Sequence, residues 1–312
     1  MNKTLLLEIL RKPSLLLYAL DMKEIIRLPD KIYLKILYEY KMKKKLDLSN
    51  PKTFNEKIQW LKLYDRNPEY TNMVDKYEAK KYVANIIGEE YIIPTLGVWD
   101  KFEDIDFEKL PNQFVLKPTH TSGDVFICKD KKNLDIETAR NKMNKWLKRN
   151  YFYCGREWPY KNVKPKIIAE IYIKNKGEVG LKDYKFMCFN GKVKCSFVCS
   201  NRNSEEGLNV DFYDLNWNKM PFTRHYPNSK ENIRKPINYE LMIKLSEKLA
   251  TDIPFVRVDF YEVDGKIYFG ELTFYPGSGF EEFSPEKYDK ILGDWLELPK
   301  EKREEKWEVK KH

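Results

Sequence analysis

Histidine and cysteine are scarce in this sequence of 312 residues, which contains three histidines and five cysteines. No two cysteines form a CxxC pair, and too few histidines lie near them to complete a zinc site. The odd cysteine count and the missing metal pattern fit a protein of a reducing compartment. We therefore expect a cytoplasmic location.

Long hydrophobic runs are also absent. Leucine-rich patches at residues 5–7 and 15–17 are interrupted by charges and by Pro13, well short of the ~20 apolar residues that cross a membrane. The sequence therefore predicts neither a transmembrane helix nor a signal peptide. Residues 1–45 combine these patches with lysine and arginine. They indicate either a helical cap with a solvated basic face or attachment to an anionic membrane, which would place the protein at its inner face.

Internal repeats and low-complexity linkers are missing too, whereas charge is plentiful. Charged residues make up 34% of the chain, hydrophobic residues make up 42%, and the net charge is +9. This balance and the chain length indicate a globular protein of two or three subdomains. The basic charge favours an acidic partner, and nucleic acid, an anionic membrane, polyphosphate and an acidic polysaccharide all satisfy it.

Hydrophobic periodicity and turn residues predict a mixed order of helices and strands. Expected helices span residues 53–64, 74–87, 136–149 and 239–251. Expected strands span residues 91–93, 114–117, 125–128 and 166–173, and a hairpin joins 183–189 to 192–199. A capping box at Thr53 and Glu56 opens the first helix, and Asn190-Gly191 turns the hairpin. Hairpins rather than repeating βαβ units predict an α+β fold with mainly antiparallel sheets.

The segment from Val256 to Gly277 reads as a β-hairpin around Asp264-Gly265, and its turn allows two registers. A two-residue loop sends Asp259 and Glu271 to opposite faces, because side chains alternate along a strand. A three-residue loop with a left-handed glycine instead gathers four polar side chains on one face and leaves the other face apolar. These four are Arg257, Asp259, Glu271 and Thr273. We favour the three-residue loop, because it gives one face to a core and the other to a site.

Two carboxylates beside an arginine on one sheet face suit nucleotide chemistry. Carboxylate oxygens hold one or two Mg²⁺ ions that bridge phosphates, and a guanidinium stabilises the charge that develops in the reaction. Asp259 and Glu271 are therefore candidate metal ligands, and Arg257 is a candidate catalytic residue.

Five pieces of the chain, in order, resemble the ATP-grasp enzymes. They are Asp75-Lys76 with a following helix and Ile92-Ile93-Pro94; Phe114 to Pro118 with Ser122-Gly123; Ile168 to Ile173; Asp183-Tyr184-Lys185; and Arg257 to Asp259 with Glu271 to Thr273 and Pro276-Gly277. In order, they resemble the first lysine, the second lysine with its phosphate loop, the hinge strand at adenine, the ribose acid, and the metal site. The resemblance implies two α+β subdomains that grip ATP.

Four segments resemble the TupA-like branch of this superfamily, within a match over residues 30–298. They are Asn50 to Lys57, Arg156 to Tyr160, Asp183 to Phe186 and Phe269 to Phe274. The branch is named for a protein of teichuronopeptide synthesis and is similar to proteins encoded with capsule and cell-surface polysaccharide enzymes. Two features depart from the usual pattern. Thr273 stands where many ATP-grasp enzymes place a metal-binding asparagine, and the loop from Pro118 to Gly123 has fewer glycines.

The resemblance implies a role for each candidate residue. ATP would contact Lys76, Lys117, Ser122, Gly123, Glu170, Tyr172, Ile173, Asp183 and Lys185. Asp259 and Glu271 would hold Mg²⁺, with Thr273 bound directly or through water. Arg257 and Lys185 would be catalytic. Substrates would contact Arg156, Arg202, Gly277 and Ser278.

Several of these residues also admit ordinary structural interpretations. Lys117 fits an edge lysine, and Glu170 fits a member of a buried ion pair. Asp183 and Lys185 fit an ion pair on one strand face. Arg202 fits a solvated loop position, and the aromatic residues after Arg156 fit packing at a subdomain junction.

The resemblance divides the chain into four parts. A helical N-terminal cap occupies residues 1–73, and the first ATP-grasp subdomain with the phosphate loop occupies 74–167. The hinge strand and the second subdomain with the metal site occupy 168–299, and a charged tail occupies 300–312.

The leading hypothesis is an ATP-dependent carboxylate–amine ligase that works through an acyl phosphate. It would join an amino acid or amine to an acidic, uronic-acid polysaccharide or its precursor, and no nucleic-acid partner is expected. One alternative is a nucleotide-sugar glycosyltransferase, because Asp104-Ile105-Asp106 imitates the acid-x-acid metal motif of that class. No doubly wound nucleotide-binding half surrounds this triplet, however. A kinase on the same fold and a glycan-binding accessory protein are the others.

Overall fold

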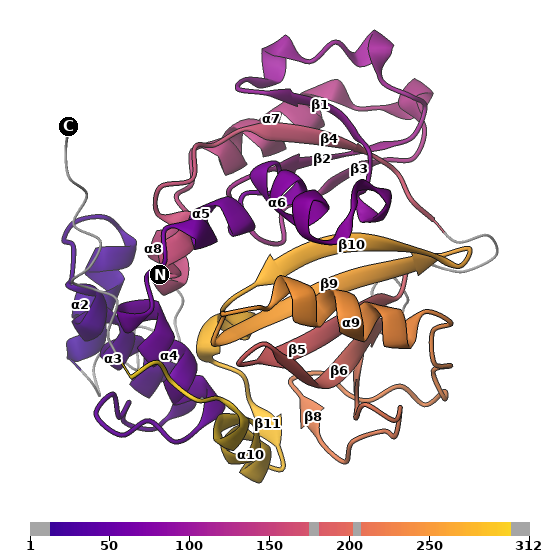
Figure 1. The fold of residues 1–312 in the computed structure, drawn as a ribbon. Coiled ribbons are helices and arrows are strands. Elements are labelled where there is room, and N and C mark those ends of the chain that lie inside the picture. Colours follow the sequence, from indigo (N-terminus) through magenta and orange to yellow (C-terminus); the bar gives the residue numbers. More distant parts are fainter. Residues whose placement is uncertain (1–12, 175–180, 202–206, 301–312) are drawn as a thin grey trace.

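The computed structural model of the chain describes residues 13–174, 181–201 and 207–300. Two antiparallel sheets face one another, and a helical cap lies at one end of them (Figure 1). The helices are α2 (Ser14–Met22), α3 (Asp30–Met42), α4 (Phe54–Tyr64), α5 (Glu69–Val74), α6 (Glu78–Ile87), α7 (Ile136–Leu147), α8 (Phe152–Gly155), α9 (Tyr239–Leu249) and α10 (Lys287–Trp295). No helix in the described part of the chain is both long and apolar enough to cross a membrane.

The strands form a four-stranded sheet, a five-stranded sheet and a small two-stranded sheet. They are β1 (Thr95–Trp99), β2 (Phe114–Pro118), β3 (Phe126–Cys128), β4 (Ile167–Ile171), β5 (Asp183–Phe189), β6 (Lys192–Ser200), β7 (Asn209–Tyr213), β8 (Thr223–Arg224), β9 (Phe255–Val263), β10 (Lys266–Thr273) and β11 (Phe283–Ser284). Their orders are β1-β4-β2-β3, β10-β9-β5-β6-β7 and β11-β8. Every named strand pair within the described residues is antiparallel, which confirms the α+β fold class.

Most expected elements are present, and the capping box is confirmed by hydrogen bonds between Thr53 and Glu56 in both directions. Two expectations were wrong. The helix expected over residues 74–87 begins only at Glu78, because the Asp75 carboxylate accepts from the backbone N–H groups of Tyr77 and Glu78 and so caps a new helix. The strand expected at 91–93 is instead the end of a 3₁₀ turn, in which the Ile92 N–H donates to the Glu89 carbonyl.

The β9–β10 hairpin has a different turn from the one we favoured. Val263 pairs with Lys266, so the loop has two residues, and both Asp264 and Gly265 have positive φ, at 50° and 77°. The expected three-residue loop was therefore wrong. A β-bulge between Phe269 and Glu271 inserts one extra residue and reverses the alternation of β10 beyond it.

Because of this bulge, the polar side chains still share one face of the hairpin, as we had expected from the incorrect turn. Asp259 lies opposite Glu271, and Arg257 lies opposite Thr273. The other face is buried, as expected, and carries Val256, Val258, Phe260, Leu272 and Phe274. The shared polar face is thus confirmed, with a different physical cause.

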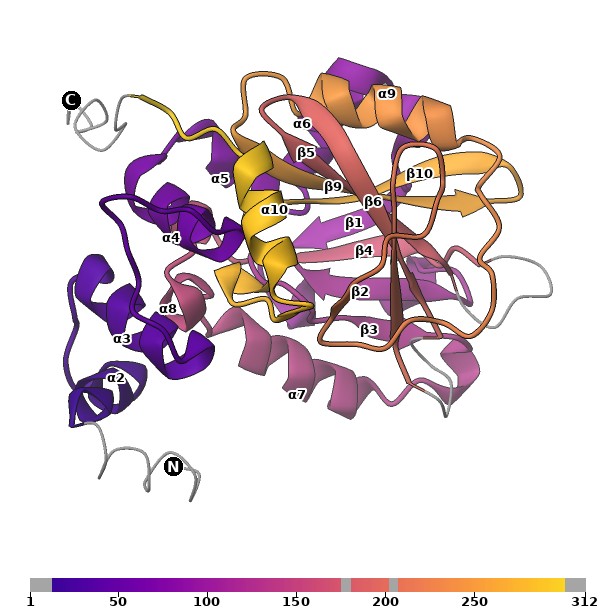
Figure 2. The same cartoon turned by 90° about the horizontal axis from the view of Figure 1, so that it is seen from below.

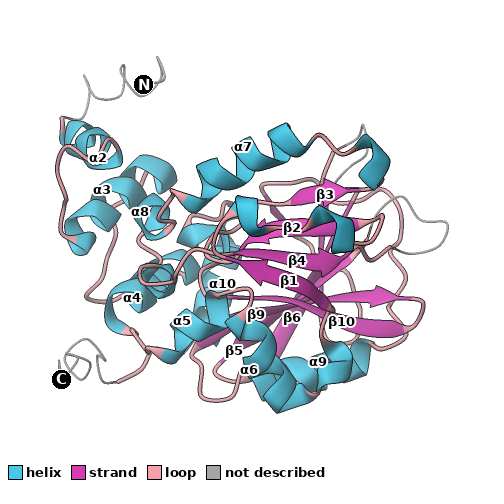
Figure 3. Ribbon diagram, turned by 90° about the horizontal axis from the view of Figure 1, so that it is seen from above, coloured by secondary structure: helices cyan, strands magenta, loops and turns pink. Residues whose placement is uncertain are grey.

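Each sheet has one face for a core and one for polar residues. In the four-stranded sheet, Phe114, Leu116 and Ala169 join a buried cluster with side chains of α7, whereas Lys117 and Glu170 alternate to the other face. In the five-stranded sheet, the apolar residues of β5 and β9 pack with α9. Figure 3 shows α7 along the four-stranded sheet and α6 beside α9.

The cap is joined to the far end of the chain. Helix α4 packs against α10, as Figure 2 shows from below. The Asn55 N–H donates to Asp289 over 2.9 Å, and the Lys57 ammonium donates to the carbonyl groups of Gly293 and Leu296. Cap side chains share one buried cluster with the five-stranded sheet and with Val83 and Ile87 of α6. The cap is therefore part of the main body, and the predicted boundary at residue 73 does not separate two cores.

This docking makes Gly293 a sensitive position. A Cβ added there would lie 2.3 Å from the Lys52 carbonyl oxygen and 2.8 Å from the Phe54 nitrogen, both of which are backbone atoms. Alanine favours a helix by up to about 1 kcal/mol, but such overpacking outweighs that gain. We predict that Gly293→Ala lowers the free energy of unfolding by about 2 kcal/mol in urea titrations. Lys290→Ala, on the exposed side of α10, serves as the control; equal midpoints for the two variants would contradict this packing.

Candidate functional site

Arg257 on β9 is the centre of the polar face between the sheets. Its Nε donates to Asp259 Oδ1, and its Nη2 donates to Asp259 Oδ2 and Glu271 Oε1, each over 2.7 Å. The Thr273 hydroxyl donates to the same Glu271 oxygen over 3.2 Å. All four residues predicted for this face therefore meet in one hydrogen-bonded cluster.

Strand β5 adds a second cation and a third acid. Lys185 lies opposite Asp259 in the strand pairing, and its ammonium donates to the Asp259 carboxylate. The same ammonium lies 3.2 Å from Asp183 Oδ2. The expected ion pair between Asp183 and Lys185 is present, and it joins the Arg257 cluster.

The four-stranded sheet presents a second group of charges. Glu170 on β4 lies between two ammonium groups, that of Lys117 at 2.6 Å and that of Lys80 at 2.5 Å. Burial alone would raise the pKa of Glu170, but the two ammonium groups lower it to about 2. The interpretation of Glu170 as a buried ion-pair member is therefore confirmed.

Lys76 connects the two groups of charges. Its ammonium donates to the Thr121 carbonyl, and it lies within the electrostatic range of Glu271 on one sheet and of Lys117 and Glu170 on the other. Burial lowers the pKa of Lys76 to about 8, with Glu271 opposing that shift. Conversely, burial would raise the pKa of Glu271, but Arg257, Lys185 and Lys76 lower it to about 2. Charges from both sheets thus act on one another.

The expected phosphate loop continues from Lys117. Thr119, His120 and Thr121 are buried, whereas Ser122 is half-buried and Gly123 is exposed, with a positive φ of 81°. A Cβ at Gly123 would meet no atom within 4 Å, so open space lies beside this glycine. Tyr151 hydrogen bonds to Ser122 and ties the loop to the segment after α7.

The remaining expected residues lie in different places. Tyr172 and Ile173 follow β4 directly and are half-buried, and Arg202 lies outside the described residues. Gly277 and Ser278 form the left-handed turn η6 (Pro276–Gly279) after β10, where the Lys62 ammonium donates to Ser278. The triplet Asp104-Ile105-Asp106 is used locally, because Asp106 accepts from the Glu108 N–H and pairs with Lys109.

Arg156 is separate from the Arg257 cluster. Its Nη2 donates to both oxygens of Asp21, at 2.8 and 2.7 Å, and its Nε lies 3.2 Å from Asp30. Its guanidinium also lies 4.0 Å from the Tyr33 ring centre, and its side chain is 1% exposed. These contacts place Arg156 inside the helical cap, so the structure gives it a packing role instead of the substrate contact that the sequence suggested.

Three charged residues beside these clusters, two of them buried, were missed from the sequence. They are Lys80, which pairs with Glu170, and Lys62 and Glu157, which both contact Ser278. The available signals were the position of Lys80 four residues after Lys76 and the place of Glu157 in the segment from Arg156 to Tyr160. Neither signal reveals which distant residue becomes the partner.

The carboxylates of Asp259 and Glu271 fit a magnesium site that phosphate oxygens and water would complete. Among the described residues, no group of three or more histidine, cysteine, aspartate or glutamate side chains could hold a metal alone. Mg²⁺ needs no such group, because one or two carboxylates together with phosphate oxygens and water complete its octahedron. The hydroxyl of Thr273 adds one more oxygen on the same face.

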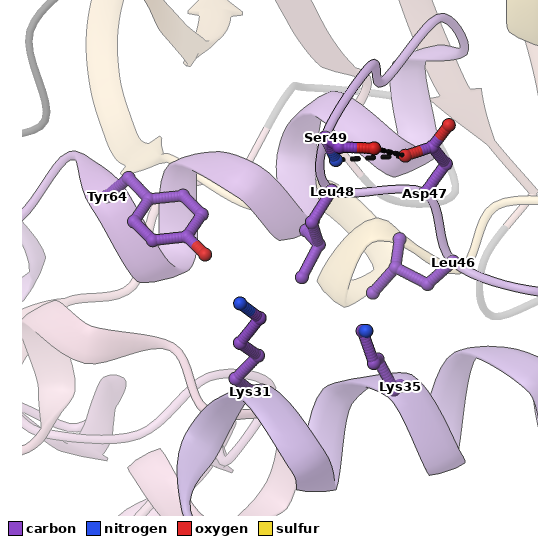
Figure 4. A pocket seen from close by; sticks show the side chains of 7 residues that line it. All are labelled: Lys31, Lys35, Leu46, Asp47, Leu48, Ser49 and Tyr64. Carbon is purple, nitrogen blue, oxygen red and sulfur yellow. Dashed lines mark hydrogen bonds between the residues drawn. The ribbon is translucent and has the colours of Figure 1, made fainter.

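A separate hollow of about 270 Å³ lies in the cap, between α3, the loop after it and α4. In Figure 4 the ammonium groups of Lys31 and Lys35 and the hydroxyl of Tyr64 point toward this space, and Asp47 binds Ser49 at its rim. It contains none of the residues of the Arg257 or Glu170 clusters. Its lysines are exposed, so it is an open basic hollow at the molecular surface.

Comparison with known proteins finds a family that matches this sequence. The model of the TupA-like ATP-grasp family matches residues 56–297. No curated protein matches the sequence. Among solved structures, 190 chains match.

Three of these structures illustrate the likeness. A D-alanine–D-alanine ligase from Bacillus anthracis complexed with ATP has 19% identity and a TM-score of 0.40, with 72% of this chain and 63% of that chain covered. The corresponding ligase from Helicobacter pylori has 15% identity, a TM-score of 0.40, and coverage of 73% and 60%. An L-amino acid ligase from Bacillus licheniformis has 15% identity, a TM-score of 0.43, and coverage of 78% and 55%. The chain thus spans less than two thirds of the length of each of these three enzymes.

The ion pairs of Glu170 generate a pH prediction. Its pKa falls from the ordinary 4.5 to about 2 on folding, so its charge stabilises the native state above pH 4.5, and this contribution is lost as the pH falls toward 2. Glu170→Gln should lower the free energy of unfolding by about 3 kcal/mol at neutral pH, and the difference from the unaltered protein should shrink across this window. Urea titrations at several pH values measure it, with exposed Glu103→Gln as the control. A difference that does not vary with pH would contradict this assignment.

Proposed function

The chain belongs to the TupA-like ATP-grasp family, and we propose that it is an ATP-dependent carboxylate–amine ligase. Members of the ATP-grasp family are typically ATP-dependent ligases. The observation that carries the proposal is the arrangement of Arg257 against Asp259 and Glu271 on one sheet, with Lys76 acting electrostatically on both sheets. Two acids surrounded by cations are the groups that a metal-bound triphosphate requires.

Each charged residue has a place in nucleotide binding under this proposal. Asp259 and Glu271 would hold Mg²⁺, with the Thr273 hydroxyl nearby, and the ion would neutralise phosphate charge. Lys76, Lys117 and Lys185 would bind phosphate oxygens as compact point charges, and the turn at Ser122-Gly123 would cover them. Adenine would lie against residues 170–173, with Asp183 toward the ribose.

The proposed reaction has two steps that share one site. A carboxylate oxygen of the first substrate takes the terminal phosphoryl group of ATP, and ADP leaves. The nitrogen of an amine then forms a bond to the carbonyl carbon, the bond from that carbon to the phosphate oxygen breaks, and inorganic phosphate leaves. Arg257 would stabilise the charge on the transferring phosphoryl group, so catalysis rests on positioning and charge neutralisation.

An acidic glycan is the substrate class that we propose for the carboxylate. The TupA-like branch is named for teichuronopeptide synthesis, in which a uronic acid would supply the carboxyl group and an amino acid the amine. The net charge of +9 favours such an acidic substrate. This role would place the protein at the cytoplasmic side of the cell envelope, in capsule or cell-surface polysaccharide synthesis.

Nucleotide binding provides the first test. We predict that millimolar Mg²⁺-ATP raises the melting temperature, because a ligand that binds only the folded state adds about 2.7 kcal/mol at a concentration of 100 times Kd. Scanning fluorimetry or calorimetry measures the shift. Lys117→Met should reduce it by removing one phosphate ligand, whereas Lys290→Ala on α10 should not. A response to UDP-sugars without any response to ATP would favour a glycosyltransferase.

The reaction itself provides the second test. ADP and phosphate should be released only when a carboxylate, such as a glucuronic-acid oligosaccharide, and an amine from an amino-acid mixture are both present. Hydroxylamine should trap the acyl phosphate as a hydroxamate. Asp259→Asn and Glu271→Gln should each lower turnover by about 100-fold or more, because each removes a charge that faces the phosphates. Exposed Glu282→Gln is the matched control. If a sugar hydroxyl keeps the phosphate, the protein is a kinase and the ligase proposal fails.

A further inference from the structure

A buried lysine from the cap reaches the turn that follows β10. Lys62 on α4 has no exposed surface, and its ammonium donates to the Gly155 carbonyl at 2.7 Å, the Ser278 carbonyl at 2.8 Å and the Ser278 hydroxyl at 2.9 Å. Three consecutive residues of this turn, from Gly277 to Gly279, have left-handed backbone angles. The ammonium therefore holds a strained turn directly after the proposed metal-binding strand.

Glu157 is the carboxylate that completes this cluster. It is 6% exposed, and Ser278 hydrogen bonds to it, so one hydroxyl links an ammonium group to a carboxylate. Glu157 also lies within the electrostatic range of Arg257 and Glu271. Burial raises the pKa of neighbouring Tyr160, and the charges of Glu157 and Glu271 add to that shift. Glu157 thus lies between the Lys62 cluster and the Arg257 cluster.

Burying the charges of Lys62 and Glu157 costs free energy, so their presence in the interior calls for an explanation. An unpaired charge in the interior costs several kcal/mol, and replacing a buried pair by apolar residues is often neutral or stabilising. Burial lowers the pKa of Lys62 to about 7, with Glu157 opposing the shift, and burial raises the pKa of Glu157, with Lys62 opposing it. Burial therefore disfavours the charged form of both groups, and perturbed groups of this kind often transfer protons.

The groups around Glu157 come from several elements. Lys62 faces it from α4, Ser278 from η6, Arg257 from β9 and Glu271 from β10. Tyr151 and Tyr160 lie on its own segment, on either side of it in the sequence. The phosphoryl-transfer proposal gives a role to neither Lys62 nor Glu157.

We propose that Glu157 accepts the proton of the incoming amine, and that Lys62 and Ser278 position its carboxylate. This inference rests on the ligase function proposed above. An alkyl amine such as that of an amino acid is an ammonium ion at neutral pH and carries no lone pair for attack. One proton passes from the ammonium to the Glu157 carboxylate, the freed lone pair forms the bond to the carbonyl carbon, and the bond to the phosphate oxygen breaks. The second proton leaves with inorganic phosphate.

The nature of the nucleophile provides a sharp experiment. Hydroxylamine is largely neutral at neutral pH, so it attacks an acyl phosphate without a base, whereas an amino acid needs one. With full-length protein, Mg²⁺-ATP and a glucuronic-acid oligosaccharide, Glu157→Gln should lower amide formation from an amino-acid mixture by about 100-fold or more. Hydroxamate formation should fall far less, by roughly tenfold at most, since this variant keeps the shape and loses only the base.

Matched variants distinguish a proton-accepting role of Glu157 from a purely structural one. Glu281 is also buried beneath the same turn but pairs with Arg224, so Glu281→Gln should change the amide and hydroxamate rates by the same factor. Glu157→Asp keeps a carboxylate and should recover part of the amide rate. Lys62→Met should shift the ratio of the two rates in the same direction as Glu157→Gln.

The outcomes distinguish this inference from the proposed function. If the unaltered protein forms no hydroxamate and no amide, the ligase proposal itself fails. If it forms both, and Glu157→Gln lowers both equally while the protein stays folded by circular dichroism, the ligase proposal stands and Glu157 is not the base. A selective loss of the amide supports the assignment.

Discussion

One extra residue in β10 determines which side chains meet Arg257. The two-residue turn at Asp264-Gly265 alone would place Glu271 on the same face as the buried Val258, where an ionised carboxylate would be very costly. The β-bulge at Gly270 moves Glu271 opposite Asp259 instead. A side chain at Gly270 would lie 3.2 Å from the Asp259 carbonyl oxygen, so glycine suits the close approach of the two strands. The acidic pair, and the cluster of cations around it, depend on this bulge.

The cations of the site are already paired with protein groups. Lys117 binds Glu170, Lys185 binds two aspartates, and Arg257 binds Asp259 and Glu271. Pairing offsets part of the free-energy cost of burying these charges. Under the proposed function, a triphosphate would have to replace these ion pairs, and its affinity would reflect the difference between two sets of contacts. Such a ligand would need enough negative charge to compensate for several partners at once.

The sequence predicted what is encoded locally and missed what depends on distant contacts. The capping box at Thr53, the Asn190-Gly191 turn and the alternation of β9 follow from neighbouring residues, and all are present. The partner of Arg156 could not be found in this way, because Asp21 lies 135 positions earlier and occupies its guanidinium within the cap. The register of β10 shows the same limit, because Gly270 was the local sign of a bulge, and only the pairing with β9 reveals that the strand shifts there.

Helix α4 connects the cap to the turn that follows β10. Lys62 donates to Ser278, and Gln59, one turn earlier, donates to the carbonyl groups of Ser278 and Gly279. The other end of α4 is fixed by Asp289 and by backbone carbonyls of the last helix. The two sheets therefore carry the Arg257 and Glu170 clusters, whereas the cap positions the turn after β10. Substitutions in α4 would alter the position of Ser278 and Glu157 while the ion pairs of Lys117 and Glu170 stay intact. Under the proposed function, such substitutions would affect the second substrate more than the nucleotide.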